Sequence, residues 1–225
     1  MTDSKASKKL TGTAFAAQKA AEALARTSVK SSKTRAPAEK QLSLELWPDA
    51  VRGVPNSVLR GALFGVSVAR KTHKRRTLIA ALENYEIRFK GETFNQTDLD
   101  TLQGMLHLAR PHPLGTRVEF SVHSFLKELG RGTGKEQHEQ FKEQVMRLVT
   151  GGIEITSLED KKTFMGTLVH KAFRDEITGR YVVIFDEDML QLYQTGHTLI
   201  DWEQRQALGK NNLAKWLQGF YASHA

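Results

Sequence analysis

The chain has 225 residues, and its 33 lysines and arginines against 25 aspartates and glutamates give a formal net charge of +8. It contains no cysteine, which excludes disulfide frameworks, thiolate metal sites and cysteine nucleophiles. The longest stretch without Asp, Glu, Lys or Arg is the twelve residues from Met189 to Ile200, too short to cross a bilayer.

The first 40 residues form a basic, alanine-rich segment. They hold nine basic and three acidic residues, and Phe15 is their only aromatic residue. Such a composition buries too little apolar surface to offset the entropy lost on ordering, so residues 1–40 are predicted to be a disordered tail. No apolar run follows the first lysines, so no secretory signal is visible and we expect a soluble, cytoplasmic protein.

The sequence QLSLEL follows this tail at residues 41–46. Alternating leucines behind a glutamine are typical of extended peptides that dock into hydrophobic grooves. Residues 41–55 are therefore predicted to be a linker that carries a binding motif, with leucines that pack on the body beside Trp47 as the alternative. The predicted docking residues are Gln41, Leu42, Leu44 and Leu46.

The remaining body, residues 41–225, is nearly neutral, with 24 basic and 22 acidic residues. Asn56 opens a short apolar helix, and RKTHKRR at residues 70–76 is then predicted to be a loop. Five cations within seven residues favour phosphate contact with a polyanion, although a merely solvated charge run is the alternative. The predicted DNA-contacting side chains of this segment are Arg70, Lys71, Lys74, Arg75 and Arg76.

Hydrophobic periodicity predicts alternating helices and strands between residues 85 and 185. The expected elements are, in chain order, a strand over 85–90, a helix opened by Thr97, a short strand over 118–120, a helix from Ser121 to Leu129, a helix from Lys135 to Thr150, and strands over 152–156, 163–173 and 180–185. This order is typical of a winged helix-turn-helix, although other α+β domains share it. We therefore predict an α+β fold with a first winged-helix domain at residues 56–202.

The helix from Lys135 takes the recognition position in that prediction. Its cations, Lys135, Lys142 and Arg147, are predicted to contact DNA. Three glutamates balance them, and carboxylates near phosphates oppose base reading. We expect the helix either to position the domain on the DNA backbone or to mediate contacts of a homodimer.

Two motifs invite a chemical interpretation that the residues do not support. GRGTGK at residues 130–135 lacks the spacing and the preceding strand of a phosphate loop, so a flexible turn is favoured over the alternative of a nucleotide-hydrolysing enzyme. The acidic run at residues 186–188 precedes a short apolar segment and is better explained as a helix cap. The histidines show no metal-ligand spacing. No catalytic residue, metal or cofactor is predicted, and we do not expect an enzyme.

The last segment, residues 211–223, carries apolar side chains at the spacing of a wide helix face. The chain ends two residues later. Either this helix folds back on the body, or it opens a further domain that is missing. We predict that residues 203–225 begin a truncated second winged-helix domain.

Several segments, in this order, resemble the TrfA family of plasmid replication initiators. The closest stretch runs from QLSLELWPD through VPNSVLRGALF. Further similarity lies in RPHPLGTRVEFSVHSFLKELG, FKEQVMRLVTGGIEIT, YVVIFDE and WEQRQALGKNNLAKWLQGFYASH. The resemblance covers residues 41–224.

The resemblance implies a replication initiator with two winged-helix domains that binds double-stranded DNA at repeated sites (iterons) of a plasmid origin. It also implies recruitment of the host initiator DnaA, the replicative helicase and the sliding clamp. The family's clamp motif is QLSLF, of which Gln41 to Leu44 match while Glu45 replaces the aromatic residue. The alternative function is a winged-helix transcriptional regulator without a replication role.

Overall fold

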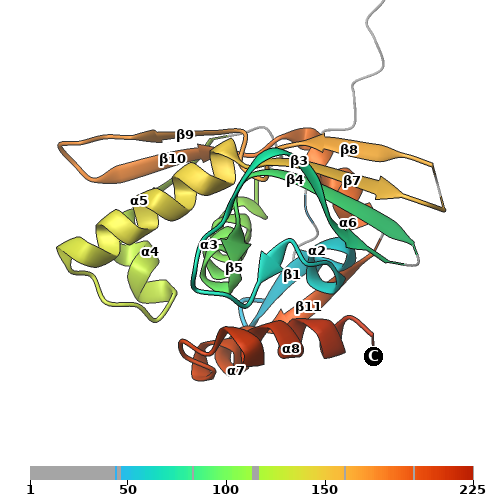
Figure 1. Cartoon of the computed structure of the whole chain (residues 1–225). Helices are drawn as coiled ribbons and strands as arrows, with labels where there is room; N and C mark the ends of the chain where they lie inside the picture. Colours follow the sequence, from blue (N-terminus) through green and yellow to red (C-terminus); the bar gives the residue numbers. More distant parts are fainter. Residues whose placement is uncertain are drawn as a thin grey trace, which may run out of the picture. The chain divides into compact units, whose positions relative to one another are not determined.

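A computed structural model describes residues 44, 47–82, 84–112, 117–159, 161–194 and 196–224 (Figure 1). The chain divides into Met1–Gln41 and Leu42–Ala225, and only the second part holds described residues. The predicted tail, residues 1–40, lies outside them. Within the described residues, helices and strands alternate, so the α+β prediction is confirmed. No helix of this described part is long and apolar enough to span a membrane.

An antiparallel sheet of four strands forms one side of the described unit. Its order is β3 (Thr72–Ala81), β4 (Tyr85–Glu92), β7 (Gly152–Ser157) and β8 (Thr163–Gly166). Alternate residues of the sheet point into the core, because side chains of a strand alternate between its two faces. The buried side chains are Ile87, Phe89, Ile153, Ile155 and Phe164. The predicted strands over 85–90 and 152–156 are confirmed.

The prediction of a loop over residues 70–76 is wrong, because Thr72 opens strand β3. The register shifts between His73 and Thr77, so residues 74–76 bulge opposite Lys90 of β4. β3 lies at one end of the strand order. An edge strand tolerates consecutive charges, and charges and bulges discourage pairing with further strands.

A second antiparallel sheet has the order β6 (Arg117–Ser121), β10 (Arg180–Ile184) and β9 (Lys171–Arg174). The prediction of one strand over 163–173 is wrong, since this run supplies β8 to the first sheet and β9 to the second. Leu168 and Val169 lie between the two strands and are completely buried. Val169 also donates its backbone N–H to the Leu148 carbonyl at 3.2 Å. This anchored crossing breaks the apparent continuous strand.

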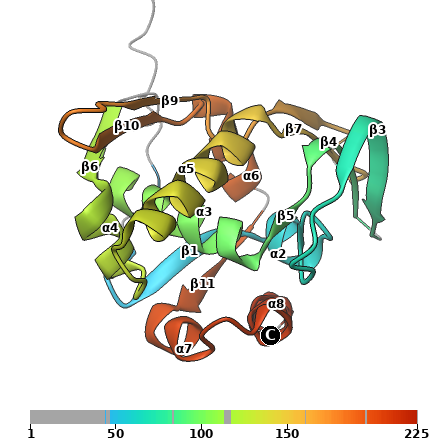
Figure 2. The same cartoon turned by 60° about the vertical axis from the view of Figure 1, so that its left-hand side comes forward.

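Three helices accompany the second sheet: α3 (Gln96–Ala109), α4 (Val122–Glu128) and α5 (Lys135–Thr150). Aromatic rings from β6, α4, α5 and β10 pack together with centroids 4.7–6.3 Å apart. These rings belong to Phe120, Phe125, Phe141 and Tyr181. Helix α3 lies between α5 and β1 (Val51–Pro55) (Figure 2). The predicted helix from Lys135 to Thr150 is confirmed.

Helix α3 begins at Gln96, with Asn95 as its cap in place of the predicted Thr97. The Asn95 Oδ1 accepts the backbone N–H of Thr97 at 3.0 Å, and the Asp98 carboxylate accepts the backbone N–H of Asn95 at 2.8 Å. This capping box satisfies N–H groups that have no partner within the helix. It fixes the first turn of α3, where Asp98 and Asp100 lie.

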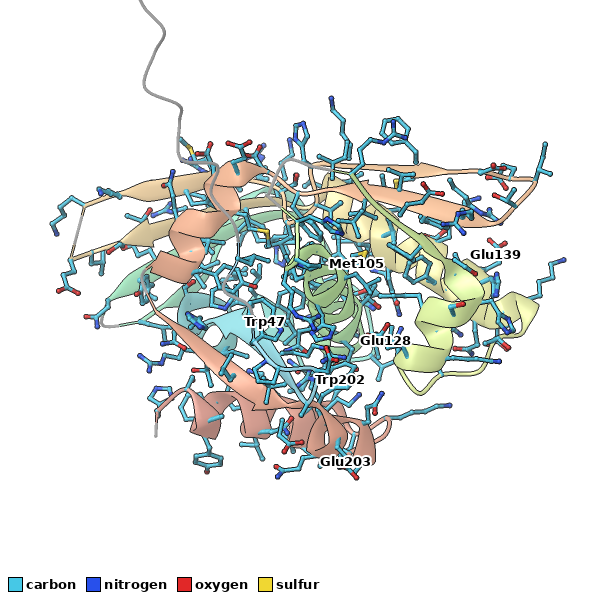
Figure 3. The ribbon with its side chains drawn as sticks, turned by 180° about the vertical axis from the view of Figure 1, so that it is seen from behind. Trp47, Met105, Glu128, Glu139, Trp202 and Glu203 are labelled. Carbon is cyan, nitrogen blue, oxygen red and sulfur yellow. The ribbon has the colours of Figure 1, made fainter. Side chains whose placement is uncertain are left out.

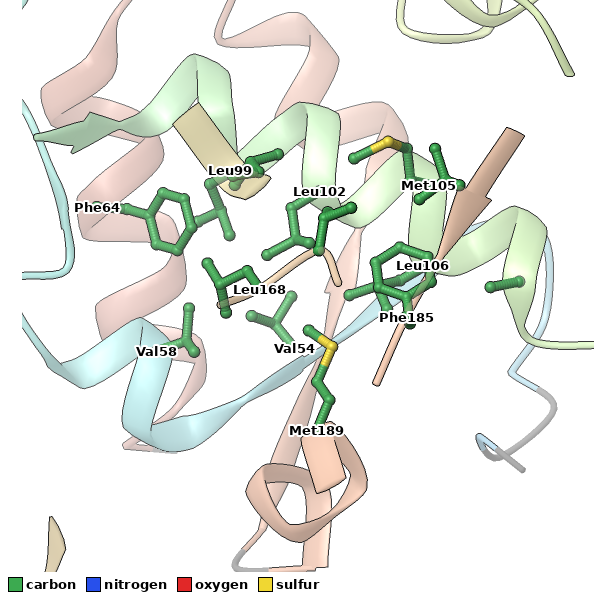
Figure 4. Packing of buried hydrophobic residues seen from close by; sticks show 14 of the residues in the cluster. Val54, Val58, Phe64, Leu99, Leu102, Met105, Leu106, Leu168, Phe185 and Met189 are labelled. Carbon is green, nitrogen blue, oxygen red and sulfur yellow. The ribbon is translucent and has the colours of Figure 1, made fainter. Parts of the chain in front are cut away.

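The two ends of the described unit meet. Strand β1 pairs antiparallel with β11 (His197–Asp201), and α2 (Asn56–Arg60) follows β1. The short strands β2 (Phe64–Gly65) and β5 (Phe94–Asn95) pair in parallel. Three short helices precede the last helix: η1 (Glu187–Met189), α6 (Leu190–Gln194) and α7 (Trp202–Ala207). Residues from β1, α2, α3 and η1 share one core (Figure 4). The predicted domain boundaries at 55/56 and 202/203 stay predictions, although β1 and β11 join the segments on either side of the first.

The last helix, α8 (Asn212–Ala222), confirms the predicted terminal helix, and Asn211 caps it. Its polar and small residues face the body: Asn212, Lys215, Gly219 and, just beyond it, Ser223 are buried. Of its apolar residues, Leu213 is 55% and Tyr221 66% exposed, while Trp216, Leu217 and Phe220 are half-buried. The helix folds back on the body, yet leaves much of its apolar face uncovered.

Candidate nucleic-acid interface

Two of the predicted DNA-contacting arginines meet one buried carboxylate. The Arg70 Nη1 donates to Asp98 Oδ2 at 2.6 Å, while the Nε and Nη2 of Arg147 donate to Asp98 Oδ1 at 3.2 and 3.0 Å. The Asp98 side chain is completely buried. Hydrogen bonds between ionised groups are stronger than neutral ones. Arg70 and Arg147 therefore attach the start of β3 and helix α5 to α3, and their contact with DNA stays a prediction.

A second carboxylate of α3, Asp100, binds the C-terminal helices. Arg205 Nε lies 2.6 Å from Asp100 Oδ1, and Lys215 Nζ lies 2.6 Å from Asp100 Oδ2. Arg131 is the third cation near Asp100, with its Nη2 3.8 Å from Asp100 Oδ2. Burial lowers the pKa of Arg131 below the ordinary value for an arginine. We call Asp98, Asp100 and the cations around them the α3 charge cluster. Its cations are Arg70, Arg131, Arg147, Arg205 and Lys215.

The other predicted cations of the basic segment behave differently. Lys71, Lys74 and Arg75 are exposed, and no side-chain carboxylate of the described residues forms an ion pair with them. Arg76 is bound, because its Nη1 lies 2.5 Å from Glu154 Oε2 on β7. Lys90 lies opposite the bulge and is also exposed. We call Lys71, Lys74, Arg75 and Lys90 the β3 basic edge.

Sequence reasoning missed Lys90. The signal was present, because the alternation in the predicted strand over 85–90 places Lys90 on the face opposite to Ile87 and Phe89. Its position across from Lys74–Arg76 became visible only with the strand register.

The exposed face of helix α5 is acidic. Glu136, Glu139 and Glu143 are exposed. Of the predicted contacts on this helix, Lys135 is exposed at its first residue and Lys142 is half-buried. The acidic side chains oppose close approach of phosphates to this face. The predicted cations of α5 therefore do not join the β3 basic edge.

Two further exposed cations lie on the outer face of the second sheet. Ile184 pairs with both Arg117 and Lys171, so these three side chains form one row across β6, β10 and β9. Neither cation has a carboxylate partner among the described residues. Arg180 on the same face is bound to Glu119 at 2.5 Å. Sequence reasoning missed this row, because strand pairing alone aligns it.

The structure describes one residue of the predicted docking motif. Leu44 is buried, with 3% of its surface exposed, in the same core as Trp47. Gln41, Leu42 and Leu46 lie outside the described residues. The packing of Leu44 agrees with the alternative in which these leucines cover the body, whereas docking to a partner stays a prediction.

Trp47 also belongs to a polar group beneath β1. Its Nε1 donates to His107 Nδ1 at 3.1 Å, and His107 Nε2 lies 3.3 Å from Asp49 Oδ1. Burial, followed by the nearby Arg52 and Arg110, lowers the pKa of His107 to about 4. A neutral imidazole that accepts at Nδ1 and donates at Nε2 fits both contacts. Figure 3 labels Trp47 of this polar group, with Glu128 and Trp202 nearby in the same view.

The two motifs for which a nucleotide-binding or metal-binding role was considered, GRGTGK and the acidic run at residues 186–188, have structural roles. The turn of GRGTGK follows α4, and Gly130 adopts φ of 68° there. The backbone N–H of Arg131 bonds to the Leu126 carbonyl at 2.9 Å, an arrangement that ends helices. Asp186 accepts the backbone N–H of Asp188 at 3.0 Å, as a cap does. The described residues contain no group of three or more His, Asp or Glu side chains suited to a metal ion.

A solved structure with a similar fold supports the observed architecture. The crystal structure of domain 2 and domain 3 of RctB matches with a TM-score of 0.52 and 10% identity, over 76% of this chain and 71% of that chain. A second crystal structure, of RctB domains 2-3, matches with a TM-score of 0.46 and 10% identity, over 60% of this chain and 57% of that one. At this identity the likeness concerns the fold alone.

Comparison of sequences gives the relationship. The Plasmid replication initiator protein TrfA of Escherichia coli is 25% identical over 197 residues, which are 83% of this chain and 51% of that protein. The chain therefore spans about half the length of this relative. The family described as TrfA protein matches residues 7–225. Because that match extends over nearly the whole chain, this protein belongs to the TrfA family.

Proposed function

We propose that this chain acts in plasmid replication initiation and binds double-stranded DNA at the repeated sites of a plasmid origin. The family membership supports the role in replication. The observation that carries DNA binding is the β3 basic edge, with four exposed cations and no carboxylate partner among the described residues. Phosphates are the ligands that such a cluster attracts, by direct contact and counterion release.

The chain order supports a winged-helix unit within this fold. Helices α3, α4 and α5 are the three helices, β6 lies between the first two, and β9 and β10 follow as the wing. The sheet order β6-β10-β9 places the last strand in the middle, as a winged helix does. Strands β7 and β8 leave this unit to pair with β4. We propose the winged-helix assignment on this topology.

The acidic face of α5 argues against base reading by this helix. We therefore propose that the chain contacts the DNA backbone, with the β3 basic edge as the main contact and Arg117 and Lys171 as a second one. Binding of this kind is salt-sensitive, and it discriminates weakly between sequences.

Fluorescence anisotropy with two labelled duplexes tests this function. One duplex carries the origin repeats and the other the same bases in shuffled order. We expect both to bind at low salt, with affinities that differ by less than about tenfold. Absence of binding at 50 mM salt, or binding that salt does not weaken, would contradict the proposal.

We further propose that host DnaA, the replicative helicase and the sliding clamp are partners, with the clamp contact through Gln41, Leu42, Leu44 and Leu46. Leu44 is buried, so this contact requires Leu44 to leave the core or the other residues to suffice. Binding to the sliding clamp also distinguishes the two candidate functions, because a transcriptional regulator without a replication role is not expected to bind the clamp. We expect a pull-down with purified clamp to retain the chain weakly, and Gln41→Ala with Leu42→Ala to abolish retention.

A further inference from the structure

Residues of strand β3, which Figure 2 shows at the outer edge of the described unit, line two hollows. One has a volume of about 450 Å³ and the other of about 360 Å³. The two hollows are neighbours, because they share part of their lining, and we refer to the pair as the groove. The shared residues are Ala62, Gly65, Val66 and Ile79.

The walls of this groove are apolar. Strand β3 and the residue after it supply Ile79 to Leu82, and α8 supplies Leu213 and Trp216. The rim is open, with Val66 43% and Leu213 55% exposed. Helix α8 buries polar residues against the body, and its apolar Leu213 and Trp216 line the larger hollow. Contiguous exposed apolar surface of this kind marks interaction sites in proteins.

One cationic side chain lines each hollow, Lys71 the smaller and Arg60 the larger, and no carboxylate of the residues that the structure describes lines either one. The Arg60 Nη2 donates to the Ser223 carbonyl, while its buried Nε has no hydrogen-bond partner. The groove therefore combines apolar walls with one cationic side chain in each hollow.

We propose that this groove binds a segment of a partner protein in which aliphatic side chains are flanked by carboxylates. Each hollow has the volume of pockets that hold a few apolar groups, and the cations complement acidic flanks. The bulges of β3 between His73 and Thr77 and between Leu78 and Ala80 interrupt any long strand ladder. The inserted side chains, and not backbone pairing, therefore provide the affinity.

Lys71 belongs to both the β3 basic edge and the groove, but other residues separate DNA binding from segment binding. Lys74 and Arg75 belong to the β3 basic edge but line neither hollow. Ala62 lines both hollows and is exposed, so Ala62→Trp fills the groove without changing the charge. Each function can thus fail without the other.

Fluorescence anisotropy of the full chain with labelled synthetic peptides tests the proposal. One peptide carries three leucines between aspartates, and the other carries the same leucines between lysines. We expect the acidic peptide to bind with a dissociation constant of tens of micromolar and the basic one at least tenfold more weakly. Ala62→Trp and Leu213→Ser should each weaken the acidic peptide at least tenfold, while Lys74→Ala with Arg75→Ala should leave its binding unchanged.

Ile177→Ser is the matched control, because Ile177 is a 97% exposed apolar residue in the turn between β9 and β10 and lines neither hollow. Retained DNA binding by Ala62→Trp shows that this variant folds. Equal binding of the two peptides, or an acidic peptide that the groove variants do not weaken, would overturn the proposal. So would a labelled fatty acid that binds the groove while the acidic peptide does not, or self-association of the chain that Ala62→Trp abolishes.

Discussion

The α3 charge cluster and the β3 basic edge contain similar numbers of cations, but the cations of the cluster are paired with carboxylates inside the protein and those of the edge are exposed to solvent. In the cluster, five cations from different parts of the chain surround two buried carboxylates. At the edge, four cations face solvent without a carboxylate partner among the described residues. Cations buried with a carboxylate partner are engaged within the fold, which depends on that carboxylate to offset their burial. Exposed cations without such a partner remain available to a ligand. The charge of a segment therefore indicates a binding surface only after its ion pairs are known.

The largest expected effect is on the cluster. Asp100→Asn leaves Arg205 and Lys215 buried without their carboxylate, and breaking a buried ion pair typically costs about 3–5 kcal/mol. We expect urea denaturation to show a loss of this size in the free energy of unfolding. Glu176→Gln is the control, since Glu176 pairs with Arg174 but is 68% exposed, and it should cost less than about 1 kcal/mol. An equal loss in the free energy of unfolding for the two variants would contradict the distinction between buried and exposed ion pairs.

The next effect concerns the buried histidine beside Trp47. The folded protein lowers the pKa of His107 from 6.5 to about 4, so between these pH values the unfolded state binds more protons at this residue. The His107 contribution to stability is therefore complete above pH 6.5 and is lost as the pH falls toward 4. At about 1.4 kcal/mol per pKa unit, the loss reaches up to about 3 kcal/mol.

His107→Gln isolates this effect. We expect the free energy of unfolding of the variant to fall less steeply than that of the unchanged protein between pH 6.5 and pH 4. Denaturant titrations at several pH values measure the two slopes. Identical slopes would mean that His107 is not held neutral in the folded state.

The smallest effect concerns α5. Because the β3 basic edge is the proposed main contact, replacing Glu139 and Glu143 with glutamine should raise the affinity for duplex DNA by less than about threefold, the range of a distant charge change at physiological salt. Anisotropy with the shuffled duplex measures it. An increase of tenfold or more would place α5 against the phosphates and move the interface away from β3.

Sequence periodicity predicted the regular elements with a buried face. The strand around Ile87 and Phe89 and the helix from Lys135 repeat apolar residues at the period of their structure, and these residues are buried. The apolar period of the terminal helix predicted that helix as well, although its most buried residues are polar or small. The start of β3 escaped this reasoning, because an edge strand with charged residues has no apolar period. The split between β8 and β9 escaped it as well, since buried Leu168 and Val169 read as part of a longer strand.

The sequence predicted which residues of the candidate site are cations, but not which of these cations form ion pairs with carboxylates. The sequence indicated Arg70, Arg76 and Arg147 as cations, but their carboxylates lie 28, 78 and 49 residues away along the chain. Only the folded arrangement separates them from Lys74 and Arg75, which have no such partner in the part of the chain that the structure describes.

The most direct test of the central claim is the salt dependence of duplex binding by Lys74→Ala with Arg75→Ala. Lys162→Ala with Lys210→Ala is the matched control, because it removes the same charge from exposed positions outside the β3 basic edge. Each lost phosphate contact reduces the slope of log affinity against log salt by about 0.9. We expect the slope of the first variant to fall by about 2 and that of the control to stay unchanged. Equal slopes for the two variants would contradict binding of DNA at the β3 basic edge.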